Sequence, residues 1–162
     1  MADTAHAHDA SVTRTVELDA QIDDVWEAVS TPELLGGWLE GEVELDVRPG
    51  GSGTVVEPDG AVRQVRIDEV EPTRRLALHW WPEDGSSPAS SVELDLQPTP
   101  GGTRLVVTET LAAPRPVWAQ ASLHGGGHRA QASTATAAAS AQWDLRLLLL
   151  GCALVRVPAS CR

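Results

Sequence analysis

Residues 143–154 read WDLRLLLLGCAL, and this stretch decides the fold that we expect of the chain. Its large apolar side chains recur at i, i+4, i+7 and i+11, the spacing of one stripe on an α-helix: Trp143, Leu147, Leu150 and Leu154. The pattern predicts one long helix over residues 134–157. The leucine run makes the helix apolar on more than one side, as expected where a sheet lies beneath it. Charged residues interrupt the run and disfavour a membrane-spanning helix: Asp144, Arg146 and Arg156.

The segments upstream of this helix alternate apolar and polar residues. They are short, and turns such as Pro49-Gly50-Gly51 and Pro58-Asp59-Gly60 separate them. This pattern is typical of an antiparallel meander. With a first strand over residues 12–18, it predicts about six to seven strands, and a slip in the alternation near Glu69 predicts a β-bulge. Because the strands share one apolar face, the long helix is expected to cover that face.

Two short helices are expected directly after the first strand. Asp19 is positioned to cap a helix whose buried stripe begins at Ile22. Thr31 and Pro32 are typical of the start of a second helix, which we expect to end at the glycine pair 36–37, just before Trp38.

Composition predicts one globular domain. The chain has 162 residues, of which 42% are hydrophobic and 22% charged, and we expect a leader over 1–11, a domain over 12–157 and a tail over 158–162. The formal net charge of −11 argues against nucleic acid as a partner and disfavours anionic membrane surfaces. The first residues lack a secretory signal, so a cytoplasmic location is expected. Cys152 is expected to be a buried free thiol, and Cys161 a free thiol in the tail.

Several short motifs, taken in order, resemble one known family. They are AQIDDVWEAV over 20–29, then Pro32-Glu33-Leu34 and Trp38, Arg48-Pro49-Gly50-Gly51, Asp59-Gly60, Val70-Glu71-Pro72 before Arg75-Leu76, and Gly102-Thr103-Arg104-Leu105. They resemble the START-like helix-grip (SRPBCC) superfamily, in the branch related to the activator of heat-shock protein 90 ATPase. The resemblance covers residues 12–111 well and Trp143 onward loosely. It implies an α+β helix-grip fold, in which a curved antiparallel sheet wraps around a long C-terminal helix.

The resemblance leaves several functions open, because one scaffold hosts many. The superfamily includes sterol and lipid carriers and aromatic polyketide cyclases. Our leading hypothesis is non-catalytic binding of a hydrophobic small molecule, such as a lipid, isoprenoid or aromatic metabolite, between sheet and helix, with no cofactor. One alternative is a polyketide cyclase or dehydratase-like enzyme, in which Glu109 or Arg63 takes part. The other is a chaperone-associated interaction module.

The side chains predicted to line the ligand space are those of inward parity on the strands and on the long helix. The same residues would also make a closed core, since large apolar residues are usually buried for stability. With six Trp and no Phe or Tyr, any aromatic wall must be indole, which makes Trp38 and Trp80 candidates for the mouth of a cavity. The full predicted set is Trp38, Val65, Ile67, Leu78, Trp80, Leu94, Leu96, Leu105, Val107, Glu109, Trp143, Leu147 and Leu150.

Polar candidates are few. Glu109 continues the inward parity of Leu105 and Val107, so its carboxylate is the one weak candidate for a catalytic base or ligand anchor. His124 and His128 flank three glycines within a long loop or lid expected over 112–133. A metal site needs rigidly held ligands, which a glycine loop does not provide, so no metal site is predicted. His79 has outward parity on its strand.

Overall fold

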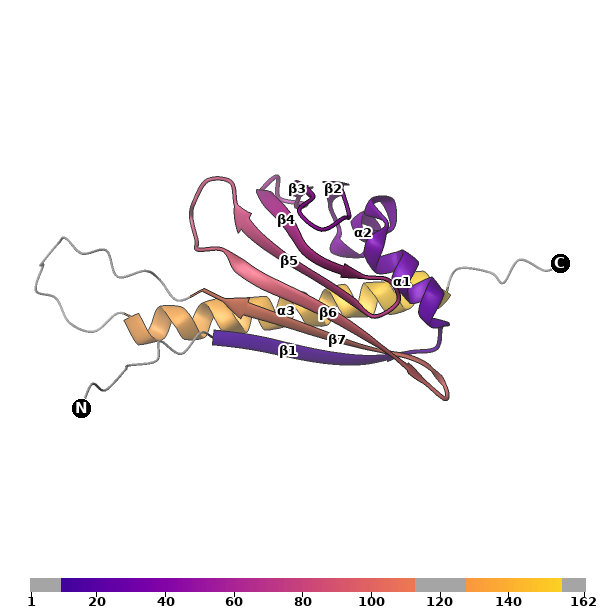
Figure 1. Cartoon of the computed structure of the whole chain (residues 1–162). Coiled ribbons are helices and arrows are strands. Elements are labelled where there is room, and N and C mark those ends of the chain that lie inside the picture. Colours follow the sequence, from indigo (N-terminus) through magenta and orange to yellow (C-terminus); the bar gives the residue numbers. More distant parts are fainter. Residues whose placement is uncertain (1–9, 113–127, 156–162) are drawn as a thin grey trace, which may run out of the picture.

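A computed structural model describes residues 10–112 and 128–155, with residues 128–134 described by their backbone alone. It contains a seven-stranded antiparallel sheet and three helices (Figure 1). The strands are β1 (Ala10–Leu18), β2 (Glu42–Leu45), β3 (Ser52–Val56), β4 (Val62–Glu71), β5 (Arg75–Pro82), β6 (Ser90–Thr99) and β7 (Gly102–Leu111). The helices are α1 (Ile22–Ser30), α2 (Pro32–Leu39) and α3 (His128–Val155). The predicted α+β helix-grip architecture is confirmed.

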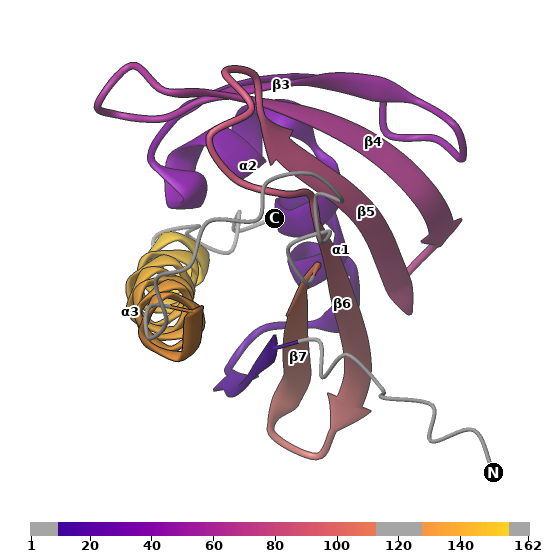
Figure 2. The same ribbon diagram turned by 90° about the vertical axis from the view of Figure 1, so that its left-hand side faces the viewer.

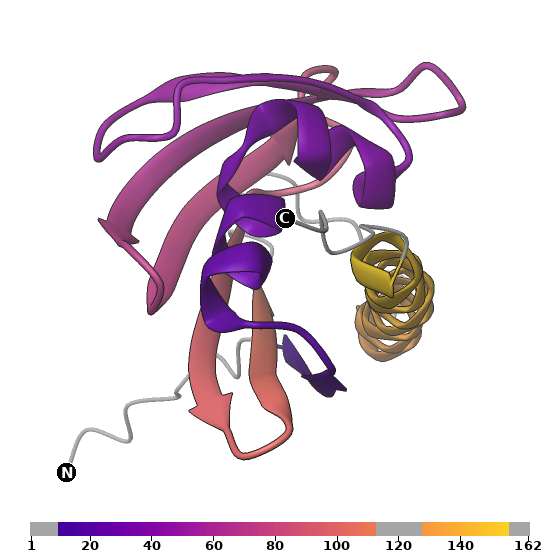
Figure 3. The ribbon, with the colours of Figure 1, turned by 90° about the vertical axis from the view of Figure 1, so that its right-hand side faces the viewer.

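The sheet runs in the order β1-β7-β6-β5-β4-β3-β2. Strands β2 to β7 form a meander, each paired with the next, as the turn-separated alternation predicts. Strand β1 closes the other end by pairing with β7 over its whole length. The sheet curves, and α3 lies on its concave side with α1 and α2 (Figures 2 and 3).

Helix α3 is the core helix of the fold. Over Ala135–Val155 it is long and apolar enough to cross a membrane by length and composition alone. Its predicted stripe, however, is buried against the rest of the domain at Trp143, Leu147 and Leu150. The helix packs along β1 and against α2 and α1. One side of the apolar run therefore faces the core, while Leu145 and Leu148 on the other side are exposed.

The predicted bulge is present in β4. Ile67 pairs with Leu78 and Glu69 pairs with Ala77, so Asp68 between them has no partner residue on β5. An extra residue of this kind bends a strand and increases its twist. It helps the sheet to curl around α3.

Four predicted boundaries are wrong by a few residues. The cap of α1 is Gln21, not Asp19, and it makes no side-chain hydrogen bond to the helix. Helix α2 starts after Thr31 as predicted but continues through the glycine pair to Leu39. Burial of Trp38 and Leu39 outweighs the cost of about 1 kcal/mol for each glycine inside a helix.

The other two boundaries concern β1 and α3. Strand β1 begins at Ala10, within the predicted leader. Helix α3 begins at His128 instead of residue 134, so the last six residues of the expected loop 112–133 are helical. The predicted tail over 158–162 lies outside the described residues.

Candidate functional site

A buried carboxylate joins two tryptophans at the centre of the sheet–helix interface. Glu109 on β7 is 4% exposed, and it accepts hydrogen bonds from the indole Nε1 of Trp80 on β5 at 3.0 Å and of Trp143 on α3 at 2.7 Å. Each carboxylate oxygen takes one indole. The two rings stack with centroids 5.9 Å apart and planes 24° apart. The carboxylate thereby fixes the orientation of both rings.

Two arginines lie against these rings. The guanidinium carbon of Arg63 on β4 is 4.9 Å from the centroid of the Trp80 ring. That of Arg146 on α3 is 5.2 Å from the Trp80 centroid and 5.4 Å from the Trp143 centroid. These are cation–π distances, and such contacts strengthen where water is excluded. Arg146, at 5% exposure, is such a desolvated case.

One carboxylate oxygen serves both arginines. Oε1 of Glu57, which follows β3, accepts hydrogen bonds from Arg63 Nε at 3.0 Å and from Arg146 Nη2 at 3.1 Å. Glu57 therefore connects the β3–β4 turn to α3. We call the six residues Glu57, Arg63, Trp80, Glu109, Trp143 and Arg146 the Trp–Arg cluster.

The electrostatics of the cluster centre on Arg146. Burial lowers the pKa of its guanidinium below the ordinary value, and the neighbouring charge of Arg63 acts in the same direction. Glu57 and Glu109 oppose this shift. The interior therefore holds a cation at a cost that two carboxylates offset only in part.

A polar pocket borders the outer side of the cluster. Its volume is about 440 Å³, and Glu57 and Arg63 form part of its wall together with Pro82 and residues of the β3–β4 and β5–β6 turns. Glu83 and Asp84 add acidic groups to this wall. Glu57 and Arg63, two members of the Trp–Arg cluster, are thus accessible from the surface through this pocket.

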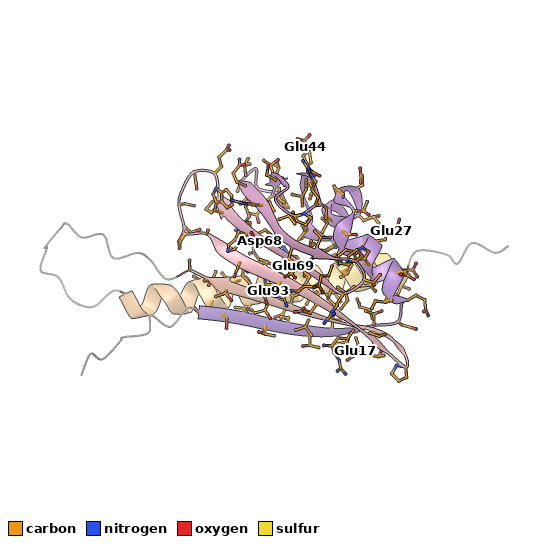
Figure 4. All side chains as sticks on the ribbon, viewed as in Figure 1. Glu17, Glu27, Glu44, Asp68, Glu69 and Glu93 are labelled. Carbon is orange, nitrogen blue, oxygen red and sulfur yellow. The ribbon has the colours of Figure 1, made fainter. Side chains whose placement is uncertain are left out.

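The remaining acidic residues are mostly on the outside. Those labelled in Figure 4 are exposed or half-buried, and several lie on the face of the sheet away from α3: Glu17, Asp68, Glu69 and Glu93. Within the part of the chain that the structure describes, the acidic excess therefore lies mainly on the outer surface. Glu109 is the one buried acid in the part of the chain that the structure describes.

Comparison with known proteins identifies the family to which this architecture belongs. A family model described as activator of Hsp90 ATPase homolog 1-like protein matches residues 19–133, well over half of the chain. The chain belongs to this family. No curated protein sequence matches it.

Solved structures share the fold of this Hsp90 activator-like domain. Protein MLL2253 from Mesorhizobium loti has a TM-score of 0.76 at 21% identity, over 92% of this chain and 99% of its own. DynU16, from the dynemicin biosynthetic locus, has 0.73 at 26% identity, over 91% of this chain and 48% of its own. CalU16 from Micromonospora echinospora has a TM-score of 0.68 at 25% identity, over 93% of this chain and 77% of its own. This chain thus spans about half the length of DynU16. Family and fold together indicate a ligand-binding or cyclase-like domain.

The predicted site residues of the Hsp90 activator-like domain fall into three groups. Trp80, Glu109 and Trp143 meet in the Trp–Arg cluster. The apolar residues lie in the surrounding core, with Leu78 partly buried and the rest buried: Val65, Ile67, Leu94, Leu96, Leu105, Val107, Leu147 and Leu150. Trp38 is 1% exposed and donates its indole N–H to the Ala28 carbonyl at 3.0 Å, so it belongs to the packing of α1 on α2. Whether any of these residues binds a ligand stays a prediction.

Sequence reasoning missed Glu57 and undervalued Arg146. Arg146 follows Trp143 by three residues, so helical spacing already places both on one face. That spacing was the available signal. Glu57 lies just after a strand, at the start of a turn, where no periodicity indicates a direction.

A second groove, of about 550 Å³, lies between β1 and α3, and apolar residues such as Val16, Leu147 and Leu148 line much of it. At its edge Arg14 Nε pairs with Asp144 at 2.6 Å. Cys152 borders this groove and is exposed, so the prediction of a buried thiol is wrong. Position 152 lies outside the buried stripe, on the opposite side of α3 from Leu150.

The histidines do not come together in a metal site within the described residues. His79 is exposed and pairs with Asp68 on the outer face of the sheet. His128 is the first residue of α3, and His124 and Cys161 lie outside the described residues. Among the side chains of residues 10–112 and 135–155, no group of three His, Cys, Asp or Glu is placed to hold a metal ion.

Proposed function

We propose that this domain binds an apolar, ring-containing small molecule in its interior, against the stacked indoles of Trp80 and Trp143. The observation that carries the proposal is the Trp–Arg cluster itself. A core built only for stability would fill this interface with aliphatic side chains. Here it holds two indoles, a carboxylate and a guanidinium, each tied to the others by hydrogen bonds or ring contacts.

The energetics favour a role for these groups beyond packing. Replacing a buried ion pair by well-packed apolar residues is often neutral or stabilising by about 1–4 kcal/mol. Stability alone therefore does not explain why buried charges such as Arg146 and Glu109 are retained in an apolar interior. Buried charges with specific partners are characteristic of binding and catalytic sites.

The arrangement of α3 also supports an interior that can admit a ligand. Its backbone packs along β1 and against α1 and α2. Toward β5 and β7 it reaches through Trp143 to Trp80 and Glu109, so large side chains rather than close backbones fill this part of the interface. Side chains with rotatable bonds can move aside for a ligand.

Among hydrophobic ligands, an aromatic metabolite fits this wall better than a lipid. Flat rings gain offset stacking on indole faces, which aliphatic chains do not. The similarity to DynU16, from the dynemicin biosynthetic locus, supports a ligand from secondary metabolism. Lipid and isoprenoid ligands are the competing outcomes of the binding test below.

A polyketide cyclase or dehydratase-like enzyme is the second candidate. It requires ionisable groups that converge on the ligand, and the grouping of Arg63, Glu109 and Arg146 around the two indoles supports it. In such a reaction Glu109 is placed to accept a proton, and an arginine is placed to stabilise a developing oxyanion. Retention of ligand binding with no turnover of cyclisable polyketide analogues would rule out this candidate.

The binding proposal is tested with 1-aminoanthracene, a neutral aromatic dye whose emission rises in apolar surroundings. We expect saturable binding to the wild-type chain. Trp80→Phe should weaken it roughly two- to tenfold through the lost indole and the lost hydrogen bond to Glu109. Trp81→Phe is the matched control, because Trp81 is the neighbouring residue of opposite parity on β5.

Two results would contradict the proposal. One is an absence of saturable dye binding by the folded wild-type chain. The other is equal affinity in Trp80→Phe and Trp81→Phe. Native mass spectrometry of the protein from cells would add the mass of any co-purified ligand and separate aromatic metabolites from lipids.

The cytoplasmic location and the chaperone-associated alternative stay predictions. The family's name refers to activation of Hsp90 ATPase. A pull-down with Hsp90 tests the chaperone alternative directly, and lack of enrichment over an unrelated acidic protein would count against it.

A further inference from the structure

Arg146 has more hydrogen-bond donors than partners. A guanidinium carries five N–H donors in one plane. Within the described residues, the only hydrogen-bond acceptor for Arg146 is Glu57 Oε1, which Nη2 reaches at 3.1 Å. Buried side-chain donors normally find partners. Among the described residues, Nε, Nη1 and one N–H of Nη2 therefore have no acceptor. Each Nη2 hydrogen lies beside either the Nε–H or an Nη1–H, so one edge with two parallel N–H groups is left unpaired.

These donors of Arg146 are nearly, but not completely, enclosed. Among the described residues, Arg75 Nε is the one fully enclosed side-chain nitrogen or oxygen without a hydrogen-bond partner, and no nitrogen of Arg146 is in that state. The Arg146 side chain is only 6% exposed, so bulk solvent has little access to its donors.

Only one of the two carboxylates of the Trp–Arg cluster forms ion pairs with its two arginines. Glu57 is shared by Arg63 and Arg146, through a single oxygen. Elsewhere the balance is reversed in this acid-rich chain, since Arg75 alone contacts three carboxylates, those of Glu69, Glu93 and Asp95. The two oxygens of Glu109 already accept the indole N–H groups.

We infer that the ligand of this interior is a flat ring system bearing an anionic oxygen group, a carboxylate or an ionised enol or phenol, which pairs with the free edge of Arg146. The guanidinium carbon of Arg146 lies 5.2 and 5.4 Å from the ring centroids of Trp80 and Trp143, and Glu57 takes only one of its donors, so further donors are left for a ligand oxygen. Arginine binds planar oxyanions through two parallel N–H bonds, which gives both strength and direction. The ring of the ligand then lies within reach of the indoles. This inference rests on the proposed function and specifies its ligand.

The test compares two probes of the same shape, 2-naphthoate and 2-naphthamide, by calorimetric titration. Wild-type protein should bind the carboxylate about tenfold or more tightly than the amide, as expected of hydrogen bonds to charged groups. Arg146→Gln should abolish this preference by weakening the binding of the carboxylate far more than the binding of the amide. Arg66→Gln, at an exposed arginine on β4, is the control and should keep the preference.

The outcomes separate the two proposals. Equal affinity for both probes in the wild type overturns the inference and leaves ring binding intact. A carboxylate preference that survives in Arg146→Gln also overturns it, because the anion then binds elsewhere. If neither naphthalene probe nor 1-aminoanthracene binds, the proposed function itself fails. Arg146→Lys provides a second variant if Arg146→Gln does not fold: it keeps the charge but loses the planar fork, so the preference should fall without disappearing.

Discussion

Replacing Glu109 by Gln tests whether this buried carboxylate organises the interior. The substitution keeps the size of the side chain but leaves one acceptor oxygen where there were two. Trp80 and Trp143 each donate to a different oxygen, so one indole N–H must then face an amide N–H₂. At 4% exposure no bulk water is at hand to replace the lost acceptor.

The magnitude follows from these two bonds. A hydrogen bond to a charged group contributes about 1.5–3 kcal/mol, and one between neutral groups about 1 kcal/mol. One bond is lost and the other becomes neutral, while removal of a buried charge offsets part of the loss. We expect a net decrease of about 2 kcal/mol in the free energy of unfolding. For a domain of this size that lowers Tm by roughly 4–8 °C.

Urea denaturation followed by far-UV circular dichroism measures the change. The matched control is Glu44→Gln, an exposed glutamate on β2, labelled in Figure 4, for which we expect a change within about 0.5 kcal/mol. If Glu109→Gln is as stable as Glu44→Gln, the carboxylate does not hold the two rings, and the account of the cluster given above is wrong.

Two further substitutions have built-in controls. Glu57→Gln should cost about 3 kcal/mol in chemical denaturation, because two arginines lose their shared carboxylate, one of them buried; Asp46→Asn, which breaks an exposed pair, should cost less than about 1 kcal/mol. Equal costs would show that the buried pairing is unimportant. Gly102 has φ +147°, and an added Cβ would lie 2.1 Å from the Leu18 carbonyl oxygen. Gly102→Ala should therefore lower stability by more than about 1 kcal/mol, whereas Gly101→Ala, with open space around it, should change thermal stability little. A tolerated Gly102→Ala would contradict the close approach of β7 to the end of β1.

Residues with a periodic signal were well predicted from the sequence. The two-residue period of β7 carries Leu105, Val107 and Glu109 to one face, and the structure places all three inside. The helical period did the same for Trp143, Leu147 and Leu150. Periodicity determines which way a side chain points. It was therefore enough to predict that three members of the Trp–Arg cluster, Trp80, Glu109 and Trp143, point inward.

Residues whose role depends on a distant partner were not predictable in the same way. Glu57 meets Arg146 across 89 positions of sequence, at a turn whose direction no pattern encodes. The end of α2 was misjudged because the glycine pair is a local stop signal, while burial of Trp38 is a tertiary effect that overrides it. Local rules fail where packing between elements decides.

The bulge at Asp68 divides β4 into two segments of opposite phase. Before it, odd-numbered Val65 and Ile67 point inward, and after it even-numbered Val70 packs against the core. Deleting Asp68 would not reverse this pattern. Glu69 would then follow Ile67 directly and stay outward, Val70 would stay inward, and their pairs with Ala77 and Leu76 would be kept. The extra residue is therefore not needed for the register of the strand. It supplies curvature, and its deletion should flatten β4 and loosen its fit around α3.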